Sequence, residues 1–320
     1  MSASAGVRDA PDAAAPFHHA AAIYGSDADF LAHVLPFVEE GLAADEPLIV
    51  TLTPPQCELL RSEIGTPSGV SVLPRGEHRA HPLLAFGAKR ALAEGHLRAG
   101  APRVRLLDDL PRDDPSTWRA WARYEALCNH HLTDLAISAL CTYDTRDSSE
   151  HVLGDVRRLH AQLTATDGDD VTSADYLEPE SFLQGWSRSS VDPLEAGDPR
   201  VTLRNPTPAD GRRVAARLAD AAGVVAEGLV TSVSEILANA HLHGRPPVTL
   251  RAWSRVGRVV VTVSDTGQGP PDPFSGLLAP DLESTHGRGL WIAHHMCDLL
   301  SIATGPDGCV VRMIVDSQEA

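Results

Sequence analysis

The chain has 320 residues, which is enough for two domains that each bury a core of their own. Its 27 basic and 43 acidic side chains give a formal net charge of −16, which opposes attraction to nucleic-acid phosphates and anionic lipid. Apolar residues make up 43% of the sequence, but no window approaches the roughly 18 uninterrupted apolar residues of a membrane span, so we expect neither direct nucleic-acid binding nor membrane insertion.

Residues 1–17 are rich in alanine and proline and have neither a basic start nor an apolar run. This composition predicts a disordered tail rather than a signal peptide. The five cysteines are widely spaced within apolar runs and form no CxxC pair. Such a distribution is typical of buried free thiols in a reducing compartment, with a redox sensor as the alternative, so we expect a cytoplasmic protein.

Residues 18–177 alternate short apolar runs with amphipathic segments, which predicts a first domain. Its expected strands are 21–24, 47–52, 70–73, 104–107 and 135–140. Its expected helices are 27–41 with Asp27 as the cap, one that opens at Pro54-Pro55, 83–96, 116–131 and 149–163. This alternation favours an α/β domain with a mostly parallel sheet and helices on both faces.

Residues 178–200 have little periodicity and several Ser, Pro and Gly residues, which indicates an interdomain linker, although Phe182, Leu183 and Trp186 suggest that part of it packs. Residues 201–320 form a second domain with a different pattern. Its expected elements are strand 201–204, helices 211–222 and 226–243, strands 248–253 and 258–264, helix 290–300, and a hairpin of 301–304 and 309–315. This order predicts an α+β domain with an antiparallel sheet and helices on one side.

The helix 226–243 carries an apolar stripe at helical spacing, formed by Leu229, Val233, Ile236, Leu237 and Ala240. Glu235 and Asn239 are four residues apart, so they lie on one face, turned away from that stripe. A carboxylate and an amide held together suit hydroxyl activation and magnesium coordination. Taken alone, such a pair is more often a solvated helix face.

Two glycine-containing segments follow. Asp265-Thr266-Gly267-Gln268-Gly269 comes directly after a buried strand, where an acid can accept from an exocyclic amine and glycines let the backbone approach a ligand. A plain strand-ending turn is the alternative. Thr285-His286-Gly287-Arg288-Gly289-Leu290 leads into a helix, whose free N–H groups can hold phosphates. By itself this segment could be an ordinary glycine-containing loop before a helix.

In this order, the three segments resemble the N, G1 and G2 boxes of the GHKL (Bergerat) ATPase superfamily over residues 201–316. The resemblance implies binding of ATP and Mg²⁺, with Asp265 at the adenine amine, Asn239 at the metal and Glu235 as the general base. It also assigns to the nucleotide pocket and its lid Gly267, Gly269, Thr285, Gly287, Gly289 and Leu290. Where the family often carries a threonine that supports the adenine site, this chain has Cys309, which removes one polar contact. Residues that could meet phosphate, or equally be surface positions, are His241, His243, Arg245 and Arg288.

The run from Glu235 through Asn239-Ala240 to His243-Gly244 resembles the N box of anti-sigma factor kinases. This implies a serine/threonine kinase or anti-sigma factor that switches between a sigma factor and a STAS-domain antagonist. A catalytically silent, nucleotide-dependent binding module is the alternative. A sensor histidine kinase is less favoured, because His151 and His160 lack the following acidic residue and proline and are interpreted as surface histidines. Small kinases of this kind often form homodimers, although the first domain could block that surface.

The first domain resembles the MEDS sensory domain. The segments that carry this resemblance are 19–24, 34–42, 46–47, 123–129 and 141–145. MEDS domains are similar in fold to RecA-type ATPases, but residues 43–47 have neither the glycines nor the lysine of a P-loop. We therefore expect a sensor or docking domain that does not hydrolyse nucleotide. Its candidate ligand residues, for which ordinary core and capping roles are the simpler interpretation, are Tyr24, Asp108, Asp109 and Tyr143.

Overall fold

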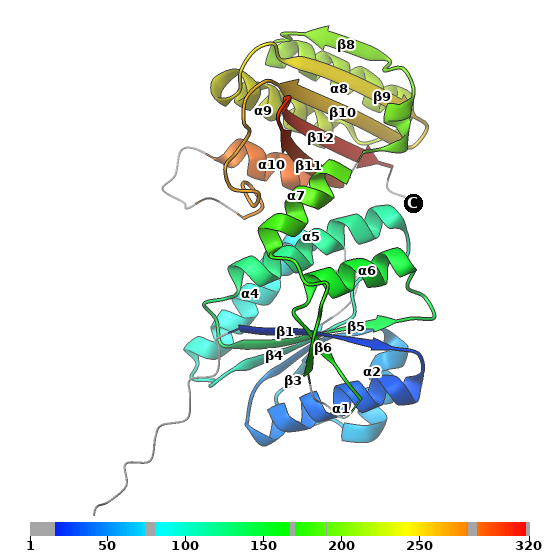
Figure 1. Cartoon of the computed structure of the whole chain (residues 1–320), viewed down its shortest axis with the longest axis vertical. Coiled ribbons are helices and arrows are strands. Elements are labelled where there is room, and N and C mark those ends of the chain that lie inside the picture. Colours follow the sequence, from blue (N-terminus) through cyan, green and yellow to red (C-terminus); the bar gives the residue numbers. More distant parts are fainter. Residues whose placement is uncertain are drawn as a thin grey trace, which may run out of the picture.

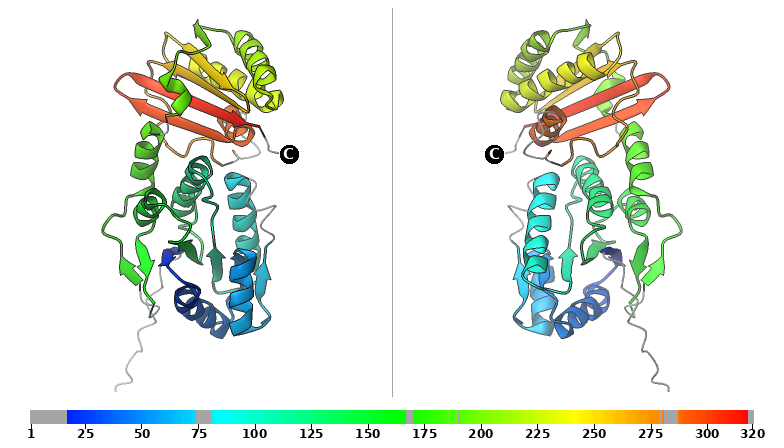
Figure 2. Two further views of the ribbon diagram at one scale, coloured as in Figure 1. Left: turned by 90° about the vertical axis from the view of Figure 1, so that its right-hand side faces the viewer. Right: turned by 90° about the vertical axis from the view of Figure 1, so that its left-hand side faces the viewer.

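The computed structural model describes residues 17–73, 81–166, 170–189, 191–278, 280 and 287–317. Two domains are stacked along the long axis of the molecule, and helix α7 (Pro179–Ser189) lies between them (Figure 1). Figure 2 shows the same arrangement from two further sides. Within the described ranges, no helix is both long and apolar enough to cross a membrane.

The first domain is built on a seven-stranded sheet in the order β3-β2-β4-β5-β1-β6-β7. The strands are β1 (Phe17–Tyr24), β2 (Leu48–Thr51), β3 (Val70–Val72), β4 (Val104–Asp108), β5 (Ile137–Asp144), β6 (Gln162–Thr164) and β7 (Asp170–Thr172). All neighbouring pairs are parallel except β6 and β7. The predicted mostly parallel α/β sheet is therefore confirmed.

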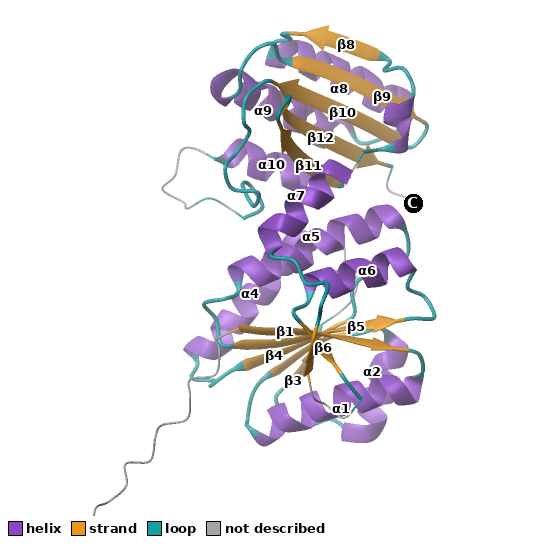
Figure 3. Cartoon of the chain, viewed as in Figure 1, coloured by secondary structure: helices purple, strands orange, loops and turns teal. Residues whose placement is uncertain are grey.

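Helices cover both faces of this sheet (Figure 3). Helices α1 (Asp27–Ala43) and α2 (Pro54–Ile64) pack on one face, and α4 (Pro82–Arg98), α5 (Pro115–His131) and α6 (Glu150–Leu159) pack on the other. Because side chains alternate along a strand, Ala20, Ala22 and Tyr24 of β1 join the first core, and Ala21 joins the second. Each face of the sheet thus has its own buried layer.

Three boundaries in this domain differ from the sequence-based expectation. Ser26, not Asp27, caps α1, since its hydroxyl accepts from the Asp29 amide. Strands β1 and β5 are longer than predicted because they pair along eight residues, from Phe17↔Ile137 to Tyr24↔Asp144. Helix α6 ends at Leu159 rather than at residue 163, because residues 162–164 pair with β1 as strand β6.

The second domain has an antiparallel sheet in the order β11-β12-β10-β9-β8. Its strands are β8 (Val201–Arg204), β9 (Thr249–Arg255), β10 (Arg258–Asp265), β11 (Leu299–Gly305) and β12 (Gly308–Asp316). Its helices are α8 (Pro208–Ala222), α9 (Ala226–His243) and α10 (Arg288–Met296). The apolar stripe of α9 is buried in one core with residues of the sheet and of α8 and α10, as predicted.

The other face of this second sheet packs toward the first domain. Trp253, Val260, Leu299 and Ile314 belong to the same buried apolar cluster as residues of α5 and α7. The segment 178–200 therefore joins the domains through packed structure, with α7 followed by the 3₁₀ helix η1 (Pro193–Ala196). Phe182, Leu183 and Trp186 of α7 are buried, as the sequence suggested.

Buried and half-buried polar contacts also hold the domains together. Arg123 Nη1 on α5 donates to the Leu300 carbonyl oxygen at 2.6 Å and lies 3.0 Å from His294 Nδ1 on α10. Around η1, Arg312 Nη2 donates to Glu195 at 2.9 Å, and Arg258 Nη2 donates to Asp192 at 2.8 Å. The apolar cluster and the Arg123 contacts fix the second domain against the first, and the ion pairs around η1 fix the connecting segment to the second sheet.

Candidate nucleotide-binding site

Glu235 and Asn239 lie half-buried on the face of α9 that α10 approaches. A Cβ atom placed on Gly289, in the first turn of α10, would be 2.6 Å from Glu235 Oε2 and 3.4 Å from Asn239 Nδ2. A side chain at residue 289 would therefore collide with the carboxylate. The glycine lets the N-terminal turn of α10, which carries free backbone N–H groups, close onto this carboxylate and amide.

Asp265 ends β10, and the backbone around it holds its carboxylate in place. Its Oδ1 atom accepts from the amides of Gly267 at 2.7 Å and Arg245 at 3.0 Å. A Cβ on Gly267 would lie 2.7 Å from the same oxygen, so this close turn requires glycine. With Oδ1 taken by two backbone donors, Oδ2 is the oxygen that can accept from a ligand.

These elements enclose a cavity of about 600 Å³. Of the predicted site residues, its lining includes Asn239, Asp265, Gly269, Gly287 and Leu290. Three others do not line it but lie against those that do: Glu235, Gly267 and Gly289. Thr285 lies outside the described residues. A cavity of this size, mainly apolar and with a few fixed polar groups, is suited to a small-molecule ligand.

Cys309 on β12 pairs directly with Asp265 across the sheet and lines the same cavity. Burial, with an addition from the neighbouring Asp265 carboxylate, raises the pKa of its thiol to about 11. The thiol is therefore neutral at physiological pH and is a weak donor. Gly269, at φ 70°, passes so close that its Cβ would lie 2.9 Å from Cys309 Sγ. Cys309, which stands where the family often carries a threonine, therefore lies beside the Asp265 carboxylate, as the sequence indicated.

Several lining residues were not predicted. Phe274 comes from the Gly/Pro-rich segment after β10, where it is the single aromatic residue and is almost fully buried. His130 at the end of α5 stacks on its ring, with centroids 3.9 Å apart and planes 14° from parallel. His131 lines the cavity itself, so the first domain contributes to this site. Phe274 could have been singled out from the sequence as the one aromatic residue of its segment. The positions of His130 and His131 could not, because they depend on how the two domains dock.

The four basic candidates for phosphate contact differ in position. His243 lines the cavity. His241 Nε2 lies 2.8 Å from the Pro206 carbonyl oxygen, Arg245 contributes its backbone amide to Asp265, and Arg288 is exposed at the start of α10. His243 is therefore the one whose side chain the structure brings to the site.

Comparison with known protein families agrees with this geometry. Residues 18–161 match the methanogen/methylotroph DcmR sensory domain, MEDS, and residues 207–315 match the histidine kinase-like ATPase domain. The chain is a MEDS domain followed by a GHKL-type ATPase domain. Both resemblances stated from the sequence are confirmed, and the fold of the second domain implies nucleotide binding.

Among solved structures, the chain is similar to the mycobacterial sensor histidine kinase MprB (18% identity, 38% of this chain and 100% of that one, TM-score 0.25). It is also similar to the histidine kinase domain of the E. coli osmosensor EnvZ (15% identity, 39% and 92%, TM-score 0.25). A third match, to the cytoplasmic domain of EssC, has 13% identity and covers 45% of this chain and 29% of EssC, with a TM-score of 0.28. No curated protein matches the chain.

The ATPase cavity fits a magnesium–nucleotide complex in the chemistry of its donors. Mg²⁺ usually takes few protein ligands and completes its shell with substrate phosphates and water, so one amide oxygen from Asn239 suits it. Gly269 and Gly289 leave room that a Cβ atom would fill. The free N–H groups of α10 and the fixed carboxylate of Asp265 lie on different elements around the cavity, as phosphate and adenine contacts require.

The candidate residues of the MEDS domain are all paired within the protein. Asp108 forms an ion pair with Lys89 at 2.7 Å, and Asp109 accepts from Arg112 at 2.9 Å. Tyr24 accepts from Gln56 at 2.7 Å, and Tyr143 donates to Glu125 at 2.6 Å. Tyr24 and Asp109 also line a smaller cavity of about 220 Å³. Ordinary core roles account for these contacts.

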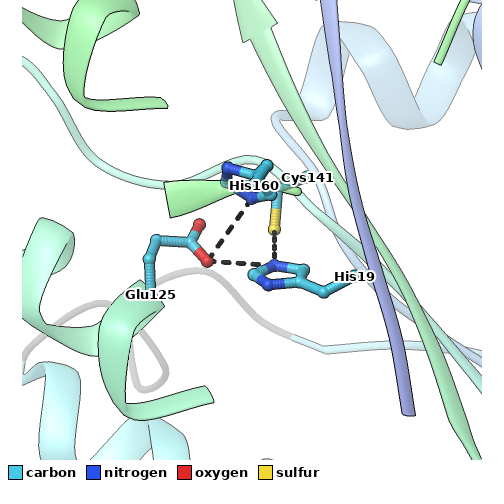
Figure 4. A group of neighbouring side chains, drawn as sticks. All are labelled: His19, Glu125, Cys141 and His160. Carbon is cyan, nitrogen blue, oxygen red and sulfur yellow. Dashed lines mark hydrogen bonds and ion pairs between the residues drawn. The ribbon is translucent and has the colours of Figure 1, made fainter. Parts of the chain in front are cut away.

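The prediction that His151 and His160 are both surface histidines is wrong for His160. His151 is exposed on α6, but His160 is fully buried, because the chain turns back toward β1 as α6 ends. There it lies beside His19, Glu125 and Cys141 (Figure 4). None of the five cysteines, all of which lie in the described part of the chain, forms a disulfide bond. Four are buried and Cys57 is half-buried, in agreement with the expectation of buried thiols.

Proposed function

We propose that this protein is a cytoplasmic anti-sigma factor with serine/threonine kinase activity, which binds Mg-ATP and switches between a sigma factor and a STAS-domain antagonist. The observation that carries the proposal is the arrangement around one cavity of Asp265, held by two backbone donors, and the Glu235–Asn239 pair beneath the start of α10. These are the groups that adenine recognition and phosphoryl transfer need.

Each residue has a definite role in this proposal. Asp265 Oδ2 accepts from the adenine amine, and the N-terminal amides of α10 hold the phosphates. Asn239 would hold Mg²⁺ at the phosphates, and Glu235 accepts a proton from the partner's hydroxyl. The Mg²⁺ ion that Asn239 would hold would supply positive charge at the phosphates. The partner's serine or threonine oxygen attacks the γ-phosphorus, the bond to the β–γ bridging oxygen breaks, and ADP leaves. Positioning supplies most of the catalysis in such reactions.

Two observations support a serine or threonine of a partner protein as the phosphoryl acceptor. The N-box run from Glu235 to Gly244 resembles the kinases that phosphorylate serine or threonine on a partner. His160, on the last stretch of the MEDS domain before α7, is fully buried and has its ring nitrogen Nδ1 2.9 Å from the Val156 carbonyl oxygen. A histidine in this position cannot reach the ATPase cavity, which favours an acceptor on another protein.

The MEDS domain has a direct physical route to the nucleotide. Helix α5 places Arg123 against α10 and β11, and His130 and His131 against Phe274 at the cavity. A change in the packing of α5 would therefore move residues that line the ATP site. We propose that the MEDS domain regulates the kinase through this helix.

The test is transfer of phosphate from γ-labelled Mg-ATP to a purified STAS-domain antagonist by the full-length chain. Label on serine or threonine of the partner is expected, and Glu235→Gln should abolish transfer while nucleotide binding is kept. Glu227→Gln, an exposed glutamate on the same helix, is the matched control and should transfer normally.

Two other results would reject the proposed serine/threonine kinase activity. An unchanged intact mass of a partner that nevertheless binds in an ATP-dependent manner would identify a silent binding module. Acid-labile phosphate on this chain itself would identify a histidine kinase.

A further inference from the structure

Four side chains with metal-binding atoms meet inside the MEDS domain: His19, Glu125, Cys141 and His160 (Figure 4). All four are buried, and their ligand atoms lie within 4.8 Å of one another. They come from β1, α5, β5 and the residue after α6, so they are far apart in the sequence. None of them belongs to the nucleotide site.

The fold explains why they meet. Strands β1 and β5 are parallel, with Ala21 opposite Cys141 and His19 opposite Ala139. Because side chains alternate, His19 and Cys141 point to the same face of the sheet, on which α5 and α6 pack. Helix α5 adds Glu125 over these strands, and the end of α6 returns the chain so that His160 completes the group (Figure 4).

The distances within the group suit tetrahedral coordination. His19 Nε2 is 3.1 Å from Glu125 Oε2 and 3.3 Å from Cys141 Sγ. His160 Nε2 is 3.7 Å from the same glutamate oxygen. Around a zinc ion with bonds of about 2.0–2.3 Å, neighbouring ligand atoms of a tetrahedron lie about 3.3–3.6 Å apart. The remaining pairs lie within 4.8 Å of each other, so movements of about 1 Å would place all four atoms on one ion.

Contacts outside the group orient both histidines. His19 Nδ1 is 2.8 Å from Asn129 Oδ1, and the Asn129 amide nitrogen donates to the Leu159 carbonyl oxygen at 2.5 Å, which fixes the direction of the asparagine. His160 Nδ1 is 2.9 Å from the Val156 carbonyl oxygen. Since both partners of Nδ1 can only accept, each Nδ1 carries a proton and Nε2 is the atom that each histidine directs at the group.

Glu125 is oriented in the same way. Its Oε1 accepts from the Tyr143 hydroxyl at 2.6 Å, which leaves Oε2 directed at the histidines. Among the described residues, His160 Nε2 is fully buried without a hydrogen-bond partner, and the buried Glu125 Oε2 meets the two imidazole nitrogens, at 3.1 Å from His19 and 3.7 Å from His160. A buried carboxylate oxygen facing two imidazole nitrogens needs a positive charge in the group, which a proton on His19 Nε2 or a bound metal ion would supply.

We propose that His19, Glu125, Cys141 and His160 bind one divalent transition-metal ion, of which Zn²⁺ fits best. Two imidazole nitrogens, a thiolate and a carboxylate are ligands of zinc and related metals rather than of Mg²⁺ or Ca²⁺. The thiolate and the carboxylate balance the charge of the ion, and the thiol proton is released on binding. Four protein ligands leave no open position, which is the pattern of a structural site.

The test uses the untagged full-length chain, expressed with added zinc and purified without chelator. Elemental analysis is expected to find about one zinc ion per chain. Cys141→Ser and His160→Gln should lose most of the metal, whereas Cys57→Ser, which changes a half-buried cysteine on α2, should keep it. Circular dichroism reports whether each variant is folded.

Cobalt gives a measurement that does not depend on any variant. The wild-type chain refolded with Co²⁺ should show a thiolate-to-cobalt charge-transfer band and the intense visible absorption of tetrahedral cobalt. The proposal is overturned if zinc is absent from the purified chain and cobalt gives neither signal. It is equally overturned if folded Cys141→Ser and His160→Gln retain the metal, because the ion would then bind elsewhere.

Discussion

At the scale of single residues, Cys309 sets the polarity of the cavity beside Asp265. Cys309 is the register partner of Asp265 across β10 and β12, and its buried thiol is a weaker hydrogen-bonding group than a hydroxyl. Cys309→Thr adds a hydroxyl at the place where related proteins carry one. One additional hydrogen bond of about 1 kcal/mol corresponds to about fivefold tighter ATP binding.

Isothermal titration calorimetry with Mg-ATP checks this expectation. Cys309→Val, which has the shape of threonine without the hydroxyl, is the control and should bind no more tightly than the natural chain. Equal effects of threonine and valine would mean that shape, not the polar contact, matters at this position.

The residues that meet at the candidate nucleotide site could be named from the sequence where a local motif places them. Glu235, Asn239 and Asp265 each belong to a short segment whose position on a helix or after a strand can be inferred from the sequence. The metal-binding group in the MEDS domain was not predictable, because no spacing links His19 with His160. Only the register of β1 against β5 and the return of the chain after α6 bring these atoms together.

At the scale of secondary-structure elements, α5 connects most of the features described above. It carries Glu125 and Asn129 at the metal-binding group, Arg123 at the ATPase domain, and His131 at the cavity. Since one rigid helix bears all four, a shift at one end is transmitted to the other. This gives the proposed regulation a structural basis.

Arg123 is the polar anchor of this helix. Its side chain is buried and donates to the Leu300 carbonyl oxygen. Burial lowers the pKa of the guanidinium to about 10. Arg123→Met removes the donor and leaves that buried carbonyl without it, so we expect a loss of about 2 kcal/mol in the free energy of unfolding.

Denaturant unfolding of the full-length chain measures this loss. Arg188→Met, which changes an exposed arginine on α7, should stay within about 0.5 kcal/mol of the natural chain. If both substitutions have the same small effect, Arg123 does not anchor the domains.

A fall in pH should weaken the contact between Arg123 and His294. Burial, followed by the charge of Arg123, lowers the pKa of His294 well below its ordinary value, and His295 and His81 add to this effect. The unfolded chain binds a proton at His294 below about pH 6.5, whereas the folded chain does not. Stability from this group is therefore complete above pH 6.5 and is lost as the pH falls, by up to about 1.4 kcal/mol per pH unit.

The free energy of unfolding at pH 7.5 and at pH 5 gives the acid-induced loss. That loss should be smaller in His294→Gln by about 1–2 kcal/mol. His151→Gln, at an exposed histidine, should lose as much as the natural chain. An unchanged pH dependence in His294→Gln would show that other groups cause the acid sensitivity.

Elements with a strong internal pattern were predicted well. The bounds of α9 agree with the expected 226–243, because a complete apolar stripe specifies that helix. The sequence indicates a linker where helix α7 forms, since the few apolar residues of this helix stand among serines and its stability comes from packing against both domains. Residues 141–144 of β5 were missed because Thr142 and Asp144 are polar, although the strand is buried throughout.

At the scale of the whole molecule, the MEDS and ATPase domains form one continuous structure. The second sheet buries one face against its own helices and part of the other against α5 and α7 (Figure 1). The first domain thereby reaches the nucleotide cavity through His131 and the Phe274 contact. The family resemblances identified both domains from the sequence, but this docking arises from surfaces that neither domain's own pattern reveals.

The central claim is that this chain binds Mg-ATP in the cavity at Asp265, and calorimetric titration of the full-length protein tests it most directly. Asp265→Asn keeps an oxygen for the amides of Gly267 and Arg245 but replaces the other oxygen by a donor. We predict about one bound nucleotide per natural chain, and at least about 30-fold weaker binding in Asp265→Asn, equivalent to ~2 kcal/mol. Asp220→Asn, at an exposed position on α8, should bind normally. No binding by the natural chain, or equal binding by Asp265→Asn, would contradict the account.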